Sequence, residues 1–122
     1  MDFANKRFLV ADEQERIHMI FQDFFFREGA QVETVSNVTQ ALDAAAQQRF
    51  DLAIIDFDFN GNNGFGLLDK LRRHNPDLPA LIITGRPNNL FLQRIEQYRN
   101  TNFLEKPVDL RLLREKIIKA FA

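Results

Sequence analysis

The sequence predicts a doubly wound α/β fold, with five parallel strands in one sheet and helices on both faces of it. Short apolar runs alternate along the chain with stretches in which apolar residues recur at helical spacing. Some runs are continuously apolar, such as Leu52–Ile55, which is typical of strands covered on both faces. Right-handed crossovers join such strands into an open parallel sheet. A chain of 122 residues fits one domain, spanning residues 1–122.

Three strands and two helices are expected in the first half of the chain. The predicted strands are Phe8–Ala11, Val32–Val35 and Leu52–Ile55. Each helix lies between two of these strands, and Gly29 is a helix-stop residue after the first helix. The apolar positions that define the helices are Ile17, Ile20, Phe21 and Phe24 in the first, and Val38, Ala41, Leu42 and Ala45 in the second.

The second half is expected to hold two strands and three helices, after a loop that contains Gly61, Asn62 and Asn63. The third helix ends at Asn75-Pro76, and Asp109 can cap the last helix. The remaining expected elements are a strand over Ala80–Ile83, a helix over Leu90–Tyr98 and a strand at Phe103-Leu104. The apolar positions of the third helix are Phe65, Leu67, Leu68 and Leu71, and those of the last helix are Leu110, Leu113, Ile117 and Phe121.

The composition excludes several classes of protein. The chain has no cysteine, so disulfides, thiolate metal sites and cysteine catalysis are excluded. Its net charge of −1 hides a split: residues 1–69 carry 12 acidic and 5 basic side chains, and residues 70–122 carry 5 acidic and 11 basic ones. No Lys/Arg-rich run favours nucleic-acid binding, and no apolar run is long enough to span a membrane or form a signal peptide. We therefore expect a cytoplasmic domain without a nucleic-acid or membrane partner.

Polar residues follow four of the predicted strands. They are Asp12-Glu13, Asp56, Thr84 and Lys106. The carboxyl ends of parallel strands meet at one edge of a sheet, so we expect these side chains to lie close together. Three converging carboxylates repel one another, and a cation must offset them. Lys106 supplies one positive charge, and Mg²⁺, which prefers oxygen ligands, would supply more.

A carboxylate beside a metal ion, a lysine and a hydroxyl has the parts needed for phosphoryl transfer. The carboxylate attacks the phosphorus, and the two cations stabilise charge on the transferring oxygens. The hydroxyl of Thr84 can then bond a phosphoryl oxygen, because a phosphoryl group brings three strong acceptors. The space that Thr84 leaves could be filled by the ring of Phe103, which lies three residues before Lys106.

The chain resembles the receiver (CheY-like) domain of bacterial two-component response regulators over essentially all of its length. The matching motifs are Asp12-Glu13, Asp56 with Gly64 eight residues later, Thr84-Gly85, and Phe103-Leu104-Glu105-Lys106-Pro107. Each motif is common by itself, whereas the ordered set, each member at a predicted strand end, is highly specific. The resemblance implies a flavodoxin-like (βα)5 fold with strand order 2-1-3-4-5.

The resemblance also implies a role for each matching residue. Asp56 would be the phosphoacceptor, phosphorylated by the phosphohistidine of a sensor histidine kinase or phosphotransfer protein. Mg²⁺ or Mn²⁺ would be held by Asp12, Asp56, the backbone carbonyl of Asp58 and, through water, Glu13. Thr84 and Phe103 would be the switch pair, and Lys106 the ion-pair partner of the phosphoryl group. The Lys106–Pro107 peptide would be cis.

The family output surface would lie on the fourth helix, the fifth strand and the last helix. The resemblance implies that phosphorylation shifts a two-state equilibrium and so controls a partner protein or a fused effector domain. The only reactions expected of the chain are its own phosphorylation and autodephosphorylation. Basic residues in these elements predict a charged partner or homodimer interface: Arg94, Arg99, Arg111, Arg114, Lys116 and Lys119.

Some positions depart from the family pattern. Phe59-Asn60 replaces the usual Met-Pro, which would loosen the loop after the phosphoacceptor, and Arg99 replaces a usual Gly, which would alter that turn. Asp58 adds a carboxylate near the site, and Arg86 lies two residues after Thr84. We hypothesise that Asp58 and Arg86 contact each other over the phosphoryl group and tune the rate of dephosphorylation.

Two other functions remain open at this point. A pseudo-receiver would bind partners without being phosphorylated, and Phe59-Asn60 is the feature that keeps this alternative. A haloacid-dehalogenase-like phosphatase would share the DxD motif Asp56-Phe57-Asp58, but that family places DxD on its first strand.

Two further features have a packing interpretation beside a functional one. Phe24, Phe25 and Phe26 cannot all face the sheet from one helix, so we expect core and rim packing, with an apolar interaction patch that includes Met19 as the alternative. His18 and His74 have no second ligand at useful spacing, and both are expected at the surface.

Overall fold

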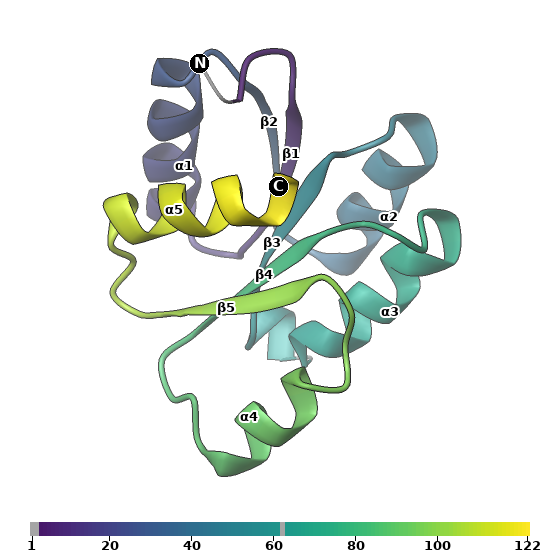
Figure 1. Ribbon diagram of the computed structural model, residues 1–122. Helices are drawn as coiled ribbons and strands as arrows, with labels where there is room; N and C mark the ends of the chain where they lie inside the picture. The colour runs from purple at the N-terminus through teal and green to yellow at the C-terminus, as the bar shows by residue number, and fades with distance from the viewer. Residues whose placement is uncertain (1–2, 62) are drawn as a thin grey trace.

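A five-stranded parallel sheet forms the centre of the molecule. The computed structural model describes residues 3–61 and 63–122 (Figure 1). The strands are β1 (Arg7–Ala11), β2 (Gln31–Val35), β3 (Leu52–Asp56), β4 (Ala80–Thr84) and β5 (Thr101–Glu105). They pair in the order β2-β1-β3-β4-β5, and every neighbouring pair is parallel. The expected fold class and strand order are confirmed.

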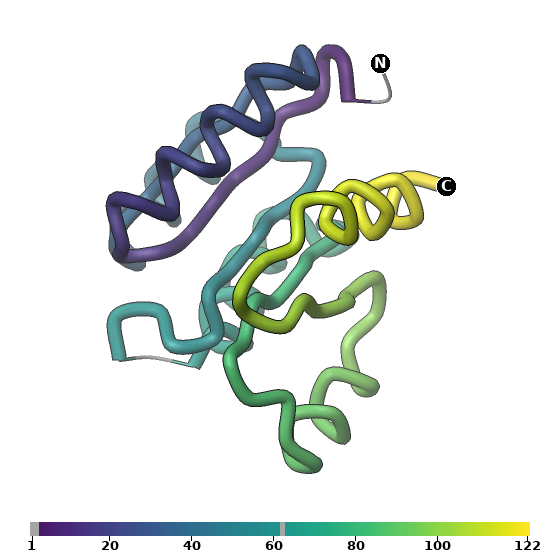
Figure 2. Tube along the Cα trace, turned by 90° about the vertical axis from the view of Figure 1, so that its left-hand side faces the viewer, coloured from purple at the N-terminus to yellow at the C-terminus, as the bar shows by residue number. Residues whose placement is uncertain are grey.

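Helices cover both faces of the sheet. They are α1 (Glu15–Arg27), α2 (Val38–Gln47), α3 (Gly64–His74), α4 (Asn89–Ile95) and α5 (Leu110–Phe121), with a short 3₁₀ turn over Phe59–Gly61. In Figure 2, α1 and α5 lie toward the viewer, and α2 and α3 lie behind the sheet. No helix in the described part of the chain is long and apolar enough to cross a membrane.

Four helices begin at a side chain that caps them. Asn37, Asn63, Asn88 and Asp109 each accept a hydrogen bond from a backbone N–H in the first turn of the helix that follows. Such a side chain satisfies one of the N–H groups that the first turn leaves unpaired. The capping role expected for Asp109 is therefore confirmed: its Oδ1 accepts from the N–H groups of Arg111 and Leu112 at 2.8 and 3.2 Å.

The core consists of two apolar clusters, one on each face of the sheet. All five residues of β3 are buried because helices cover both sides of this central strand. Phenylalanine rings fill much of the cluster beside α1, where the rings of Phe8 and Phe25 stack with centroids 4.1 Å apart. Phe24 and Phe25 are buried, whereas Phe26 is 82% exposed. The three-phenylalanine run therefore divides between core and surface, as helical periodicity requires.

The loop between β3 and α3 is held on two sides. Phe59 is completely buried in the cluster beside α2 and α3. The Asn60 side-chain amide donates a hydrogen bond of 2.8 Å to the backbone carbonyl of Ser36, and Asn60 itself has a positive φ of 54°. The expectation that Phe59-Asn60 loosens this loop is therefore wrong, because both side chains anchor it. Asn62 lies outside the described residues.

The helix expected over Leu90–Tyr98 is shorter in the structure. It ends at Ile95, and the next two bonds, from Gln97 N to Arg94 O and from Tyr98 N to Ile95 O, have the tighter i→i−3 pattern. Arg99 stands where the family usually has a glycine, and the turn there was expected to differ. In the structure the next residue, Asn100, has a positive φ of 50°. Arg99 itself pairs with Asp77 at 2.6 Å on the surface.

Candidate functional site

Four of the predicted site residues meet at the carboxyl edge of the sheet. Asp56 and Thr84 are the last residues of β3 and β4, Asp12 follows β1, and Lys106 follows β5. The N–H of Lys106 donates to the carbonyl of Thr84 at 2.8 Å, which extends the β4–β5 pairing beyond the end of β5. Asp12, Asp56 and Lys106 line one cavity of about 400 Å³. The parallel sheet thus places these side chains together, as predicted.

Asp56 is a buried carboxylate with a lysine beside it. Its side chain is 8% exposed, and Lys106 Nζ lies 3.0 Å from its Oδ1. Oδ1 is fully buried and has no well-aligned hydrogen bond, so within the described residues the Lys106 charge is its one polar contact. A buried carboxylate needs such compensation because water is excluded from it. Both side chains also line the cavity of about 400 Å³, so the pair borders open space at this edge of the sheet.

Asp12 is the second buried carboxylate. Its Oδ1 accepts a 2.8 Å hydrogen bond from the N–H of Gln14, and the side chain lies near Asp56 and Lys106. Burial is the largest influence and raises the pKa of Asp12; the charge of Asp56 raises it further, while the Gln14 hydrogen bond and the Lys106 charge lower it. The net effect is a pKa above the usual range, mainly because burial disfavours the charged carboxylate.

The donor set fits a hard divalent cation, although it is smaller than expected. Asp12 and Asp56 supply buried carboxylate oxygens, the type of ligand that Mg²⁺ prefers, with Lys106 as the cation beside them. The Glu13 side chain is exposed, and residues 3–61 and 63–122 contain no cluster of three acidic or histidine side chains placed to bind a metal ion. The expected convergence of three carboxylates is therefore wrong: two converge.

The two residues predicted as a switch pair occupy neighbouring strands. Thr84 is 2% exposed, and its hydroxyl oxygen accepts a 3.2 Å hydrogen bond from the N–H of Arg86. Phe103 is half-buried, and its ring packs edge-on against Phe91 of α4 with centroids 5.4 Å apart. Lys116 Nζ lies 5.2 Å from the centroid of the Phe103 ring. The Phe103 ring thus lies between α4 and α5, and its movement toward Thr84 stays a prediction.

Gly64 lets α3 begin directly against the end of β3. A Cβ atom at this position would lie 2.9 Å from the Asp56 carbonyl oxygen and 3.1 Å from the Cα of Phe57. The N–H of Gly64 also donates to the carbonyl of Phe57 at 2.7 Å. Only glycine permits this approach without displacing backbone, so the residue that carries part of the sequence motif has a steric role in positioning Asp56.

The proposed tuning residues, Asp58 and Arg86, are exposed at the rim of the site. Both line a second cavity of about 390 Å³ together with Thr84 and Lys106. No ion pair joins them within the described part of the chain, so their contact stays a prediction. The Lys106–Pro107 peptide bond is cis, as the resemblance implied.

His18 is the residue that the sequence reasoning misplaced. It was expected at the surface, but it is 4% exposed and its Nε2 lies 2.5 Å from the carbonyl oxygen of Asp12. The signal was present in the sequence, since His18, Phe21 and Phe25 share the buried face of α1 at spacings of three and four. His74 is exposed on α3, as expected.

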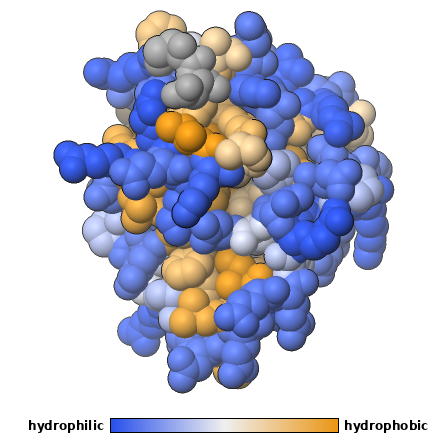
Figure 3. Space-filling model, viewed as in Figure 1, coloured by the Kyte–Doolittle hydropathy of each residue, from blue (hydrophilic) through white to orange (hydrophobic). Residues whose placement is uncertain are grey.

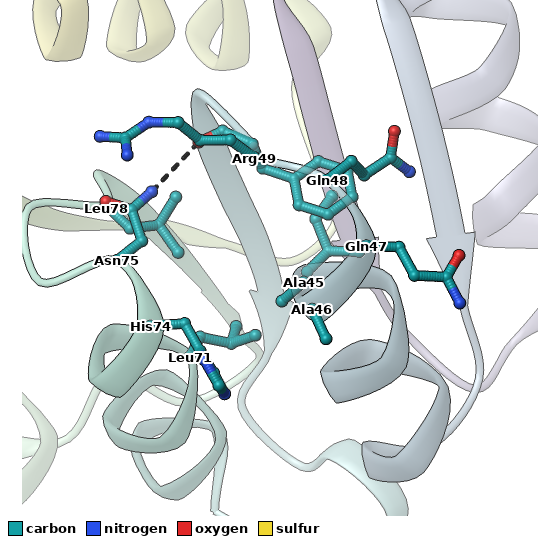
Figure 4. Close-up of a pocket in the computed structure, with 11 residues that line it drawn as sticks. Ala45, Ala46, Gln47, Gln48, Arg49, Leu71, His74, Asn75 and Leu78 are labelled. Carbon is teal, nitrogen blue, oxygen red and sulfur yellow. Dashed lines mark hydrogen bonds between the residues drawn. The ribbon is translucent and has the colours of Figure 1, made fainter.

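A separate pocket lies at the opposite edge of the sheet. Figure 4 shows it between the end of α2 and the end of α3, and its volume is about 270 Å³. The dashed line marks the 3.4 Å hydrogen bond from the Asn75 side chain to the carbonyl of Phe50. Arg49 and His74 also line this pocket, whose loops precede β3 and β4. It is therefore remote from Asp56, which ends β3.

Residues 8–118 match the response regulator receiver domain family. The chain belongs to this family. A receiver domain is a signalling module of two-component phosphorelay systems rather than a classical enzyme, so the chain acts in phosphorylation-dependent signalling. The phosphatase alternative is excluded by the family and by the position of Asp56-Phe57-Asp58 at the third strand rather than the first.

Two relatives of the receiver domain differ greatly in length. The present chain is 25% identical over 115 residues to sporulation initiation phosphotransferase F of Bacillus subtilis, and the match covers 94% of this chain and 93% of that protein. It is 31% identical over 106 residues to the sensory/regulatory protein RpfC of Xanthomonas campestris pv. campestris, covering 84% of this chain but 15% of that protein.

Solved structures of receiver domains have the same fold. Chemotaxis protein CheY4 of Vibrio cholerae superposes with a TM-score of 0.87 at 24% identity, covering 96% of this chain and 99% of that one. A CheY-like receiver domain protein from Methanospirillum hungatei superposes with a TM-score of 0.86 at 25% identity, covering 95% of this chain and 93% of that one.

Proposed function

We propose that this receiver domain accepts a phosphoryl group on Asp56 from the phosphohistidine of a sensor histidine kinase or phosphotransfer protein. The observation that carries the proposal is the buried Asp56 carboxylate with Lys106 Nζ at 3.0 Å, at the open edge of the sheet. A carboxylate that lines a cavity can act as a nucleophile, and the lysine beside it can stabilise charge on a phosphoryl group. The similarity to a phosphotransferase over 93% of its length supports the same chemistry.

The proposed transfer is a single displacement at phosphorus. An oxygen of Asp56 attacks the phosphorus, and a P–O bond forms while the P–N bond of phosphohistidine breaks. The departing imidazole nitrogen keeps the electron pair of that bond and takes a proton from water. The Lys106 side chain would pair with the transferred oxygens, so its contact with Asp56 would become a contact with the phosphoryl group.

A divalent cation, Mg²⁺ or Mn²⁺, completes this site in the proposal. Asp12, Asp56 and the backbone carbonyl of Asp58 would hold it, with Glu13 acting through water. The cation supplies positive charge for the phosphoryl oxygens during the transfer. The two buried carboxylates and the raised pKa of Asp12 support this requirement, because adding a proton is the alternative way to lower their repulsion.

The signal would leave the site through Thr84 and Phe103. The Thr84 hydroxyl, which now accepts from the Arg86 N–H, would instead donate to a phosphoryl oxygen. The movement would open space toward which the half-buried Phe103 ring can turn, away from Phe91. A phosphoryl group changes the population of the two states by as much as it interacts differently with each.

The output surface would be the face formed by α4, β5 and α5. Figure 3 shows orange apolar side chains among mostly hydrophilic ones on the side that carries these elements. Their exposed large apolar residues are Leu90, Leu92, Leu110, Leu112 and Ile118. A downstream protein, a fused effector domain or a second copy of the chain would bind here, and charge reversal at Arg94 and Arg111 is expected to weaken that binding.

Phosphorylation of the purified chain by a small phosphodonor in Mg²⁺ tests the proposed function. We expect wild type to gain one phosphoryl group, measured by intact-protein mass spectrometry, and Asp56→Asn to gain none. The matched control is Asp51→Asn, which changes a carboxylate at the opposite end of β3 and should label as wild type does. An unlabelled wild type would support the pseudo-receiver alternative instead.

Asp58 and Arg86 are proposed to tune how long the phosphoryl group lasts. Both side chains line the cavity that contains Thr84 and Lys106, so each can reach a group bound at Asp56 or the water that attacks it. We expect Asp58→Asn and Arg86→Ala to change the rate of dephosphorylation severalfold, measured by loss of the labelled mass. Equal rates in all three proteins would contradict this role.

A further inference from the structure

His18 is buried at the place where α1 approaches the acidic end of β1. It is 4% exposed and lies on the inner face of α1 with Phe21 and Phe25. A buried imidazole without a hydrogen-bond partner is costly, and this one faces the carbonyl oxygen of Asp12. A carbonyl oxygen can only accept, so Nε2 carries the proton and donates to it.

Asp12 is held at three points, and His18 provides one of them. The N–H of Asp12 donates to the carbonyl of Val35 at 3.1 Å, its carbonyl accepts from His18, and its Oδ1 accepts from the Gln14 N–H at 2.8 Å. Across residues 3–61 and 63–122, no hydrogen bond or ion pair involves the other carboxylate oxygen, Oδ2. These hydrogen bonds therefore hold the backbone and Oδ1 of Asp12 in place and leave Oδ2 available to bind a cation.

We propose that His18 is a positioning residue that sets the affinity of the acidic site for Mg²⁺. By holding the Asp12 carbonyl, it keeps the residue that leads into α1 in one orientation before the cation arrives. The binding of Mg²⁺ then costs less ordering of the backbone. This inference rests on the proposed function, because it assumes that Asp12 is a ligand of the cation.

A pair of substitutions separates hydrogen bonding from packing. His18→Phe keeps a ring but removes the donor, and His18→Gln places an amide N–H near the position of Nε2. We expect His18→Phe to raise the dissociation constant for Mg²⁺ about tenfold, the lower end of the range for residues that orient metal ligands. His18→Gln should retain most of the wild-type affinity. Titration calorimetry with MgCl₂ measures both, and the Gln14 amide shift in NMR reports the same site.

The controls keep the outcomes distinct. His74→Phe changes the exposed histidine and should bind Mg²⁺ as wild type does. Equal Mg²⁺ affinity in wild type and His18→Phe would overturn the inference while leaving the proposed function intact, as would an equal loss in the Phe and Gln variants. A wild-type protein that binds no Mg²⁺ would contradict both this inference and the proposed cation site.

Folding is checked by the thermal midpoint without Mg²⁺. If His18→Phe does not fold, His18→Met, whose flexible side chain lacks a donor, takes its place with the same expectation. Failure of both apolar variants to fold would count against the inference, because it would show that His18 is required for the fold itself.

Discussion

Asp12 and Asp56 share a site but have different surroundings. The Asp56 carboxylate has Lys106 at 3.0 Å, whereas the Asp12 carboxylate accepts a hydrogen bond from the uncharged N–H of Gln14. Burial and the Asp56 charge therefore raise the pKa of Asp12 above its ordinary value of 3.8. In the absence of a cation, ionisation of Asp12 in this buried position is therefore unfavourable.

This difference predicts a pH dependence of stability. Because the folded-state pKa of Asp12 is raised, the folded protein binds more protons than the unfolded chain as the pH rises from about 3.8, so ionisation of Asp12 lowers stability. Without Mg²⁺, Asp12→Asn should therefore raise the thermal midpoint at about pH 7 by a few degrees, and the gain should shrink toward about pH 4. A gain that is constant with pH would contradict this assignment.

Single residues also show where sequence reasoning succeeds and fails. Asp56, Thr84 and Lys106 could be predicted because each directly follows or ends an apolar strand, and a parallel sheet brings such ends together. The burial of His18 could have been predicted from its helical spacing with Phe21 and Phe25, whereas the exposure of Glu13 depends on how α1 rotates against the sheet. That rotation is decided by the phenylalanine packing around Phe8 and Phe25 rather than by residue type at a strand end.

At the scale of elements, α3 can start beside the end of β3 only because the backbone at Gly64 comes close to the backbone of Asp56 and Phe57. A Cβ at Gly64 would meet the Asp56 carbonyl, which is backbone and cannot turn aside, whereas a Cβ at Gly66, two residues later on the same helix, meets nothing within 4 Å. The two glycines therefore form a matched pair.

Alanine substitution at these two positions should have opposite effects. Gly64→Ala should cost about 1–3 kcal/mol, because the overpacked contact must be relieved by moving backbone. Gly66→Ala should be neutral or add up to about 1 kcal/mol through helix propensity. Urea unfolding measures both free energies. Equal effects would mean that the close approach at Gly64 is absent in solution.

The strands were easier to predict than α4. Continuous apolar runs identify β3 and β4 within a residue of their ends, because both strands are buried throughout. The α4 periodicity continued to Tyr98, but the helix ends at Ile95 and the Tyr98 ring stacks on Phe65 of α3 with centroids 4.8 Å apart. A contact with another element thus overrides the local pattern, which sequence periodicity alone does not report.

At the scale of the whole molecule, the acidic site makes stability depend on divalent cations. A ligand that binds only the folded state stabilises it, by about 2.7 kcal/mol at 100 times its dissociation constant. For a domain of this size we expect saturating Mg²⁺ to raise the thermal midpoint by roughly 10 °C. Asp56→Asn should reduce this rise, and EDTA should reverse it. NaCl at matched ionic strength is the control, and an equal rise with NaCl would contradict specific binding.

The unequal burial of the strands also has a consequence for amide hydrogen exchange. Every residue of β3 is buried between two paired neighbours, whereas β5 pairs only with β4 and has one buried residue, Leu104. Amides of β3 should exchange only through global unfolding, and those of β5 through local opening of the sheet edge. Phe103 therefore lies on an edge strand that opens at a lower free energy than β3, where a signal can move a ring without disturbing the centre of the molecule.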